Sequence, residues 1–245
     1  NMSHELRTPM HGILSFADFG MIKVDSVPAK RLHWYFHRIS QSGKRLLKLL
    51  NSLLDLSKLE AGKMSYDFIE AGLSDVVTQA LTLFDLMLEE SDVQIKVRAP
   101  RFLTSMIFDP DRIIQVVHNL VGNAIKFSPK GGVVTVSFCE TEQVVEGESY
   151  RAIMFSISDQ GPGIPGDELD TVFDKFYQSS KTKTGAGGTG LGLAICREIV
   201  EDHAGVIKAG NNNESKGTTL SVTLPVINDS QLLYDRLIDN QAAKQ

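Results

Sequence analysis

The sequence has 245 residues, which is enough for one large domain or two small ones. It is 42% hydrophobic and 22% charged, the composition of an ordinary globular protein. The net charge is −5 and the basic residues are scattered, so nothing indicates a nucleic-acid-binding protein. No apolar run approaches the length of a membrane span, and no signal peptide is visible. Cys139 and Cys196 lack CxxC spacing, which argues against a zinc site or disulfide framework and favours small core-facing side chains.

The first 60 residues carry two helical patterns. Apolar residues recur three or four positions apart from Ser3 to about Val24, and a turn with a proline follows at 25–30. The next pattern has two series with a spacing of seven, namely Leu32, Ile39, Leu46 and Leu53, and Tyr35, Ser42, Leu49 and Leu56. This spacing predicts a coiled-coil seam. Two helices with such wide faces pack either against a second copy of the chain in a symmetric four-helix bundle, which we favour, or against the rest of the chain.

The pattern changes after EAGKMS (60–65), which ends the second helix and opens a linker. We predict helices at 75–90, 111–127 and 191–202, and strands at 93–97, 133–138, 152–159, 206–210 and 218–225. Strands that alternate with short turns and helices predict an α+β sandwich. The tail from Asn228 is expected to be a short amphipathic helix with Ser230 as its cap. The predicted division is therefore a helical domain at 1–64, a mixed domain at 65–227 and a helical tail at 228–245.

The predicted helix at 111–127 carries a line of polar residues. Its many apolar members should bury it nearly all round, yet Arg112, Gln115, Asn119, Asn123 and Lys126 recur at intervals of three and four. The two asparagines offer amide oxygens, which suit a hard cation such as Mg²⁺, and the lysine could neutralise phosphate charge. The alternative is an ordinary solvent-facing edge, which accounts for the polarity but not for the two amides.

Two glycine-containing segments follow. In SDQGPGIP (158–165), Asp159 ends a predicted strand, and the glycines allow close approach of a flat ligand, whose exocyclic amine the carboxylate could bind. The segment GGTGLGLAI (187–195) leads into a helix, and free N–H groups at a helix start favour an anion. Taken alone, the first segment is also compatible with a hairpin turn. The loop before the second is compatible with either a mobile lid or a disordered surface loop.

In their order, these segments resemble sensor histidine kinases of two-component systems. The segments NLVGNAIKF (119–127), DQGPGI (159–164), FDKFYQ (173–178) and GTGLGL (188–193) resemble the N, G1, F and G2 boxes of that family, and SHELRTP (3–9) resembles its H box. The resemblance covers residues 1–225, and its second half extends to the wider GHKL ATPase superfamily. It implies a multidomain α and α+β protein, with a helical hairpin forming a dimeric four-helix bundle and an α/β sandwich ATP-binding domain of the Bergerat fold.

The activity that the resemblance implies is that of an ATP-dependent protein-histidine kinase. His4 would be phosphorylated, Glu5 would take its proton, and Thr8 would position water for removing phosphate from the partner protein. The phosphoryl group would pass to an aspartate of a response-regulator receiver domain, toward which phosphatase activity is also expected. On a helix, His4 and Thr8 share a stripe, so His4 should face water. Without the resemblance, an exposed helical histidine would be expected to have no function.

The resemblance also implies a site for ATP and Mg²⁺. The residues implied in ATP binding are Asn119, Asn123, Lys126, Asp159, Gly161, Gly163, Ile164, Gly188, Thr189, Gly190, Leu191, Gly192 and Thr219. Among them, Asn123 is the expected metal ligand, Asp159 and its glycines should receive adenine, and the segment 188–192 should bind the phosphates. Thr219 lies in KGTTL (216–220), which resembles the G3 box and should back the pocket.

Two other interpretations remain open at this stage. The chain could be a GHKL ATPase that hydrolyses ATP without any part for His4, or a dimeric scaffold whose nucleotide pocket is degenerate.

The expected partners are a second copy of the chain, bound through the helical bundle, and a receiver domain, with no nucleic acid. We expect the chain to be the cytosolic part of its protein, with any membrane attachment through segments outside this chain.

Overall fold

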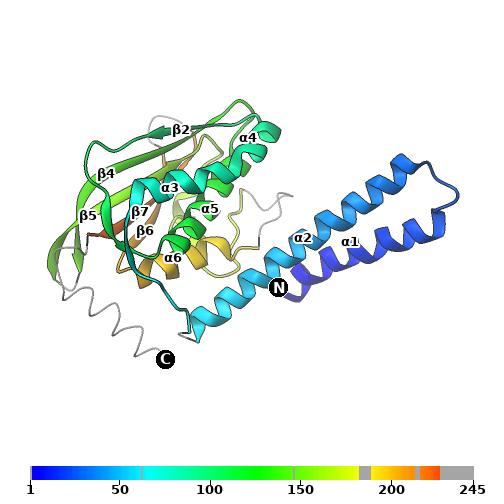
Figure 1. Ribbon diagram of the computed structural model, residues 1–245, viewed down its shortest axis with the longest axis horizontal. Helices are drawn as coiled ribbons and strands as arrows, with labels where there is room; N and C mark the ends of the chain where they lie inside the picture. The colour runs from blue at the N-terminus through cyan, green and yellow to red at the C-terminus, as the bar shows by residue number, and fades with distance from the viewer. Residues whose placement is uncertain (1, 62, 146, 182–188, 213–215, 227–245) are drawn as a thin grey trace. The chain divides into compact units, whose positions relative to one another are not determined.

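The computed structural model describes residues 2–61, 63–145, 147–181, 189–212 and 216–226. These residues form two compact units that divide between Lys58 and Leu59 (Figure 1). We call them the helical unit and the α/β unit. The domain limits expected from the sequence, 1–64 and 65–227, stay a prediction, and the expected tail helix at 228–245 lies outside the described residues.

The helical unit contains α1 (Met2–Lys23) and all but the last two residues of α2 (Ala29–Glu60), and α1 continues through the buried Pro9. Tyr35, Leu49 and Leu56, all from one of the two series with a spacing of seven, are buried. A second apolar stripe on the two helices stays exposed and comprises Met10, Leu14, Met21, Phe36, Leu47, Leu50 and Leu54. An exposed apolar surface of this kind usually marks a site of protein association. None of the described helices is both long enough and apolar enough to cross a bilayer.

The α/β unit is built on a five-stranded sheet. The strands, in spatial order, are β2 (Gln94–Arg98), β4 (Val133–Val145), β5 (Glu148–Ser158), β7 (Thr218–Pro225) and β6 (Val206–Asn211). Only the β2–β4 pair is parallel. The helices α3 (Leu73–Leu81), α5 (Pro110–Phe127) and α6 (Gly192–Asp202) form a layer against the sheet, with α5 in contact with both others (Figure 1). This arrangement confirms the predicted sandwich.

The core lies between the sheet and α5. The inward-facing positions of the helix include Ile113, Val117 and Leu120, each without exposed surface. They meet strand residues that alternate along β5 and β7, such as Phe155 and Val222, which are also fully buried. Helical periodicity on one side and a period of two on the other place the two apolar faces against each other. The core therefore holds α5, with its polar line, in a fixed position over the sheet.

The predicted helix at 75–90 is interrupted. α3 ends at Leu81, a short 3-10 turn covers Thr82–Phe84, and α4 begins at Asp85 and ends at Ser91. The Thr82 hydroxyl donates to the carbonyl of Gln79, a local bond that competes with regular helix. Two short strands were also not predicted: β1 (Ile69–Gly72) and β3 (Ser105–Phe108) pair antiparallel in a second small sheet. Further 3-10 turns lie at Gly166–Glu168 and Thr171–Phe173.

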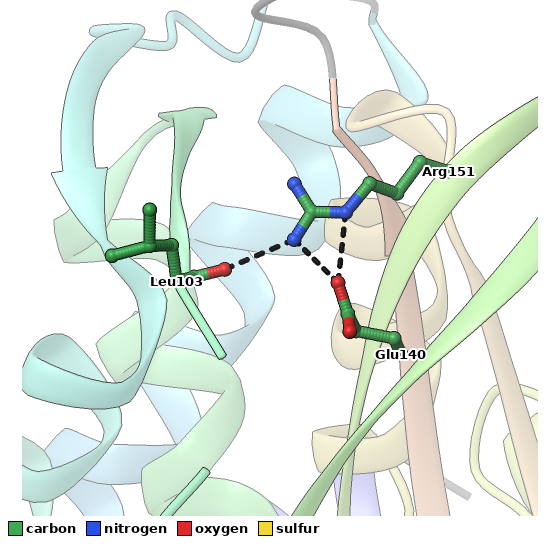
Figure 2. Close-up of polar contacts among 3 residues, drawn as sticks. All are labelled: Leu103, Glu140 and Arg151. Carbon is green, nitrogen blue, oxygen red and sulfur yellow. Dashed lines mark hydrogen bonds and ion pairs between the residues drawn. The ribbon is translucent and has the colours of Figure 1, made fainter. Parts of the chain in front are cut away.

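The β4–β5 hairpin is longer than predicted, because its pairing continues through the segment between the two predicted strands, 133–138 and 152–159. Its extension exposes Cys139, so the core-facing position expected for that cysteine is wrong, whereas Cys196 is buried as expected. Figure 2 shows the polar contacts that join the two strands of the hairpin to the loop before β3. The Arg151 guanidinium donates to Glu140 Oε1 at 2.6 and 2.9 Å, and to the Leu103 carbonyl at 3.2 Å.

The segment that enters the α/β unit packs on the buried side chain of His203, which makes hydrogen bonds at the start of α5 and near the end of α6. The imidazole donates from Nδ1 to the Ile199 carbonyl, and its Nε2 accepts the N–H of Asp109, the N-cap of α5. The rings of Tyr66 and Phe68 pack edge-on against it, at centroid distances of 5.3 and 4.9 Å. We call Tyr66–Phe68 the entry segment. Two further bonds fix it, from Tyr66 Oη to Asp202 and from the Asp67 N–H to Asp109.

This geometry requires a neutral His203, and burial lowers the pKa of the imidazole below its usual value of 6.5. Carbonyl and carboxylate neighbours, including Asp109 and Asp202, oppose that shift without overcoming it. As the pH falls below about 6.5, the unfolded chain therefore binds a proton that the folded unit does not. The free energy of unfolding of the α/β unit should fall by up to about 1.4 kcal/mol per pH unit in that range.

Denaturant unfolding of the α/β unit between pH 5 and 8 measures this dependence. A His203→Gln variant, which keeps an oxygen acceptor for the Asp109 N–H but cannot be protonated there, should be less stable at pH 8 and should lose most of the slope. An unchanged slope in the variant would show that other groups cause the acid sensitivity.

Candidate active site

The polar line of α5 lies where the sequence predicts it. Asp109 caps the helix by accepting the Arg112 N–H at 3.0 Å, and a proline follows at the first helical position. Asn119 and Asn123, one turn apart, are half-buried. Lys126 is exposed, with its Nζ 4.7 Å from the centroid of the neighbouring Phe127 ring. The helix therefore presents both amides and the lysine on the stripe that its apolar packing leaves open.

The two asparagines have different surroundings. Asn119 contacts α6: its side chain bonds to the Cys196 thiol, and a Cβ at Gly192 would lie 3.1 Å from Asn119 Oδ1. Within the described part of the chain, Asn123 has no hydrogen-bond partner for its amide. A half-buried amide without a protein partner is available to a ligand, since such groups are normally satisfied.

Asp159 lies just beyond β5 and is 8% exposed. Its Oδ1 accepts two backbone N–H groups, from Gly161 at 2.7 Å and from Thr218 at 3.1 Å. Burial nevertheless raises the pKa of the carboxyl group above its ordinary value, although both N–H bonds act in the opposite direction. Oδ2 accepts no hydrogen bond from any residue that the structure describes. The side chain is thus rigidly held, with one oxygen available for a donor.

The loop 159–165 packs directly on the end of α5. A Cβ at Gly161 would lie 2.8 Å from the Phe127 carbonyl oxygen, so only glycine allows this approach. Gly163 adopts a φ of 75°, and Ile164 follows in a half-buried position. The structure therefore brings the predicted residues of this loop to the end of the helix that carries the two asparagines.

The start of α6 is held by a similar close approach. Gly190 has a φ of 66°, and its carbonyl accepts the Phe176 N–H at 2.9 Å. The Thr189 hydroxyl accepts the N–H of Leu191, which is fully buried. Among the described residues, no side chain caps the first N–H groups of α6, and such uncapped groups suit an anion. Gly188 lies outside the described residues.

Thr219, which the sequence analysis expects to back the pocket, lies in β7 beside the residue whose N–H reaches Asp159. In β7 the buried positions alternate from Thr218, and Thr219 belongs to the half-exposed set, where its hydroxyl donates to Asn212 Oδ1 at 2.6 Å. The preceding residue, Thr218, is the one whose N–H reaches Asp159. Thr218 was not singled out in the sequence analysis, because two consecutive threonines do not show which of them faces the core. Counting back two positions from the apolar Leu220 would have identified Thr218 as the core-facing one.

His4, Glu5 and Thr8 all lie near the start of α1 in the helical unit. The side chain of His4 is outside the described part of the structure. Glu5 is half-buried, with its Oε2 3.6 Å from a guanidinium nitrogen of Arg45 on α2, a contact that the sequence did not indicate. Thr8 is exposed.

The residues present fit ATP with Mg²⁺. The unsatisfied Asp159 oxygen suits an amine of the base, the Asn123 amide oxygen suits a hard cation, and the open start of α6 suits phosphate. No group of three or more His, Cys, Asp and Glu side chains that could hold a metal occurs among the residues described. A magnesium ion would therefore depend on the amide together with phosphate oxygens and water, which is the usual mode for this ion.

Comparison with known families decides the affiliation of the chain. Residues 1–62 match the His Kinase A (phospho-acceptor) domain, and residues 108–228 match the histidine kinase-, DNA gyrase B-, and HSP90-like ATPase family. The chain belongs to the sensor histidine kinases. Within that family, the first match contains His4, Glu5 and Thr8, and the second contains every predicted residue of the nucleotide site.

Individual relatives agree with this affiliation. The chain is 32% identical to hybrid signal transduction histidine kinase D of Dictyostelium discoideum over 243 residues, 98% of this chain and 15% of the relative. Among solved structures, Acinetobacter baumannii histidine kinase AdeS matches with a TM-score of 0.68 and 25% identity, covering 92% of this chain and 98% of AdeS. Full-length ShkA in complex with AMPPNP matches at 0.63 and 25%, covering 91% and 44%. The chain spans 15 to 36% of the first three curated relatives it matches.

Proposed function

We propose that the chain phosphorylates itself on His4 with ATP and then passes the phosphoryl group to an aspartate of a response-regulator receiver domain. The observation that carries this proposal is the arrangement around Asp159, whose one free oxygen lies in the same unit as the unpaired Asn123 amide. It occurs in a chain whose other unit matches a phospho-acceptor domain. A nucleotide site alone would fit any ATPase of the superfamily, and the accompanying histidine favours the kinase.

At the nucleotide site, Asp159 Oδ2 would accept the exocyclic amine of adenine, with Gly161, Gly163 and Ile164 lining the base. The open N–H groups of α6 and the segment 188–192 would bind phosphate oxygens, with Lys126 and Asn119 near the triphosphate. That AMPPNP binds to the related ShkA supports this assignment. We propose Asn123 as the ligand of Mg²⁺, which would neutralise charge on the phosphates.

At the other site, an unprotonated ring nitrogen of His4 would attack the γ-phosphorus of ATP. The bond from that phosphorus to the bridging oxygen breaks, ADP leaves, and the proton on the other ring nitrogen passes to Glu5. The protein's main task is to position the two groups, because phosphoryl transfer makes few covalent demands on it. Since the two sites belong to different units, the reaction requires them to meet, within one chain or between two.

The proposed assembly is a homodimer through the helical unit. The match to a phospho-acceptor domain supports it, and so does the exposed apolar stripe on α1 and α2, which a second copy would cover in a four-helix bundle. The receiver domain is the second proposed partner, and Thr8 is the residue proposed to position water when the regulator is dephosphorylated. We propose a cytosolic location, where ATP and such regulators meet.

Incubation of the purified chain with γ-labelled ATP and Mg²⁺ tests the proposal. A kinase gives protein-bound label that is stable to alkali and labile to acid, as expected for phosphohistidine, and label that moves to an added receiver domain. Release of free phosphate from ATP with unlabelled protein would instead indicate an ATPase of the superfamily. Failure to bind ATP at all would indicate a scaffold.

A further inference from the structure

Two adjacent asparagines that follow the predicted strand at 206–210, Asn211 and Asn212, hold the two ends of the loop at Asp159. Asn211 is the last residue of the edge strand β6 and pairs with Thr218 at the start of β7, and Asn212 follows it. Both are outside the set of residues assigned to the nucleotide. Each uses both polar atoms of its amide, and each bonds to a different end of the same loop.

Asn211 binds the far end of the loop. Its Oδ1 accepts the Ile164 N–H at 2.8 Å and its Nδ2 donates to the Ile164 carbonyl at 2.6 Å. This is the pair of bonds that a neighbouring β-strand would make, supplied here by one side chain. Gly163 packs on the same amide, since a Cβ there would lie 2.8 Å from Asn211 Oδ1.

Asn212 binds the near end. Its Nδ2 donates to the Asp159 carbonyl at 2.8 Å, while its Oδ1 accepts the hydroxyls of Ser158 and Thr219 at 3.2 and 2.6 Å. Its backbone N–H donates to Gly217, where a Cβ would overlap the Asp159 carbonyl. Asp159 is therefore held through its backbone carbonyl, a contact that does not use its carboxylate.

The loop needs this support because residues 159–165 belong to no helix or strand. Without it, the distance between the Asp159 carboxylate and Ile164 would depend on the loop's own conformational freedom. If that distance is fixed, the Asp159 oxygen can discriminate between the two purines. It accepts a hydrogen bond from the exocyclic amine of adenine but not from the carbonyl that guanine presents at the same position. A side chain that fixes the loop therefore affects the affinity for the base and has little effect on chemistry at the γ-phosphate.

We propose that Asn211 and Asn212 are positioning residues that set the affinity and the base selectivity of the nucleotide site without touching the nucleotide. This rests on the function proposed above. Asn211 is the better test, because among the described residues its side chain bonds to Ile164 alone, and Ile164 is not assigned to catalysis.

The experiment compares the full chain with Asn211→Ala, which removes both bonds, and Asn211→Asp, which keeps the acceptor but sets a carboxylate against the Ile164 carbonyl. Both variants should bind ATP about 5- to 30-fold more weakly, as expected for two partly exposed hydrogen bonds. Their preference for ATP over GTP should narrow, while kcat for autophosphorylation at saturating ATP stays within about twofold. Asn212→Ala should change affinity and preference in the same direction. Lys208→Ala, at an exposed position of the same strand, is the matched control and should change neither.

Unchanged ATP affinity and base preference in both Asn211 variants would overturn the inference, as would a fall in kcat at an unchanged KM. Thermal unfolding in the absence of nucleotide separates these results from loss of the fold: a variant that retains the parent melting temperature but loses base preference supports positioning. If the unmodified chain binds no ATP, the proposed function fails, and this inference fails with it; if it binds ATP and GTP equally, only the inference about base selectivity fails. If the unmodified chain prefers ATP and the variants show the same affinity and the same preference, this inference fails while the proposed function stands.

Discussion

Replacing His4 with glutamine should abolish the incorporation of label from γ-labelled ATP while leaving ATP affinity within about twofold of the parent. Glutamine keeps the size and polarity of the side chain but has no nitrogen that can act as a nucleophile at neutral pH. The proposed nucleotide site lies in the other unit, so the affinity for ATP should not depend on this residue. Acid-labile label on the protein and fluorescence binding of a nucleotide analogue measure the two quantities separately.

His11→Gln is the matched control. His11 is also on α1, exposed, and on the same helical stripe as His4, one heptad later. It should label as fast as the parent. Label that persists in His4→Gln would place the phosphoacceptor elsewhere. Loss of ATP binding in His4→Gln would contradict the assignment of the two functions to separate units.

Replacing Asp159 with asparagine should weaken ATP binding by about 30- to 1,000-fold, or roughly 2–4 kcal/mol. The substituted amide can keep Oδ1 toward the N–H groups of Gly161 and Thr218. It then places an NH₂ group where the free carboxylate oxygen was, so a donor faces the amine of adenine. Isothermal titration with ATP and with ADP should show losses of similar size, because the base is common to both.

The fold should survive this substitution. Because burial raises the pKa of Asp159, the folded protein binds a proton there more readily than the unfolded chain does, and the ionised carboxylate costs stability at neutral pH. An asparagine carries no charge, so Asp159→Asn should be at least as stable as the parent at pH 7 without nucleotide. The advantage should shrink as the pH falls and the parent carboxylate becomes protonated.

Asp167→Asn makes the same change of charge at an exposed position in the short turn after the loop. It should leave ATP affinity unchanged. If Asp159→Asn binds ATP as tightly as this control does, adenine is not bound by the carboxylate. If Asp159→Asn unfolds at neutral pH, the carboxylate is needed for the fold, and the stability prediction made from its pKa is wrong.

The elements with strong periodicity could be predicted from the sequence. Both helices of the hairpin, α5, α6 and five strands of the main sheet follow from apolar spacing alone. The break after Leu81 and the short strands β1 and β3 could not, because each depends on contacts with distant residues: β1, for example, pairs with β3 more than thirty positions later. The extension of the β4–β5 hairpin past Phe138 could not be predicted for a related reason. Its polar residues show no burial pattern, and pairing with the opposite strand stabilises them in the sheet.

For the site, the order of the segments that resemble the N, G1, F and G2 boxes indicated the position of Asp159, its glycines and the asparagines of α5. It could not show that Asn119 is engaged with α6 whereas Asn123 is unpaired, since that difference arises from the packing of two helices. Nor could it find Asn211 and Asn212, because asparagine next to a glycine-containing turn is common for local reasons alone. Their role depends on a loop almost fifty residues earlier.

The entry segment also limits where this protein can be joined to another. Tyr66, Asp67 and Phe68 bond to or pack on Asp202, Asp109 and His203, which lie at the ends of the two helices beside the proposed nucleotide site. A chimera that fuses a foreign sensor stalk to this α/β unit should therefore have its junction before Tyr66. A junction after Phe68 would replace these three side chains with whatever the donor carries, and would leave a buried imidazole open to water at the seam.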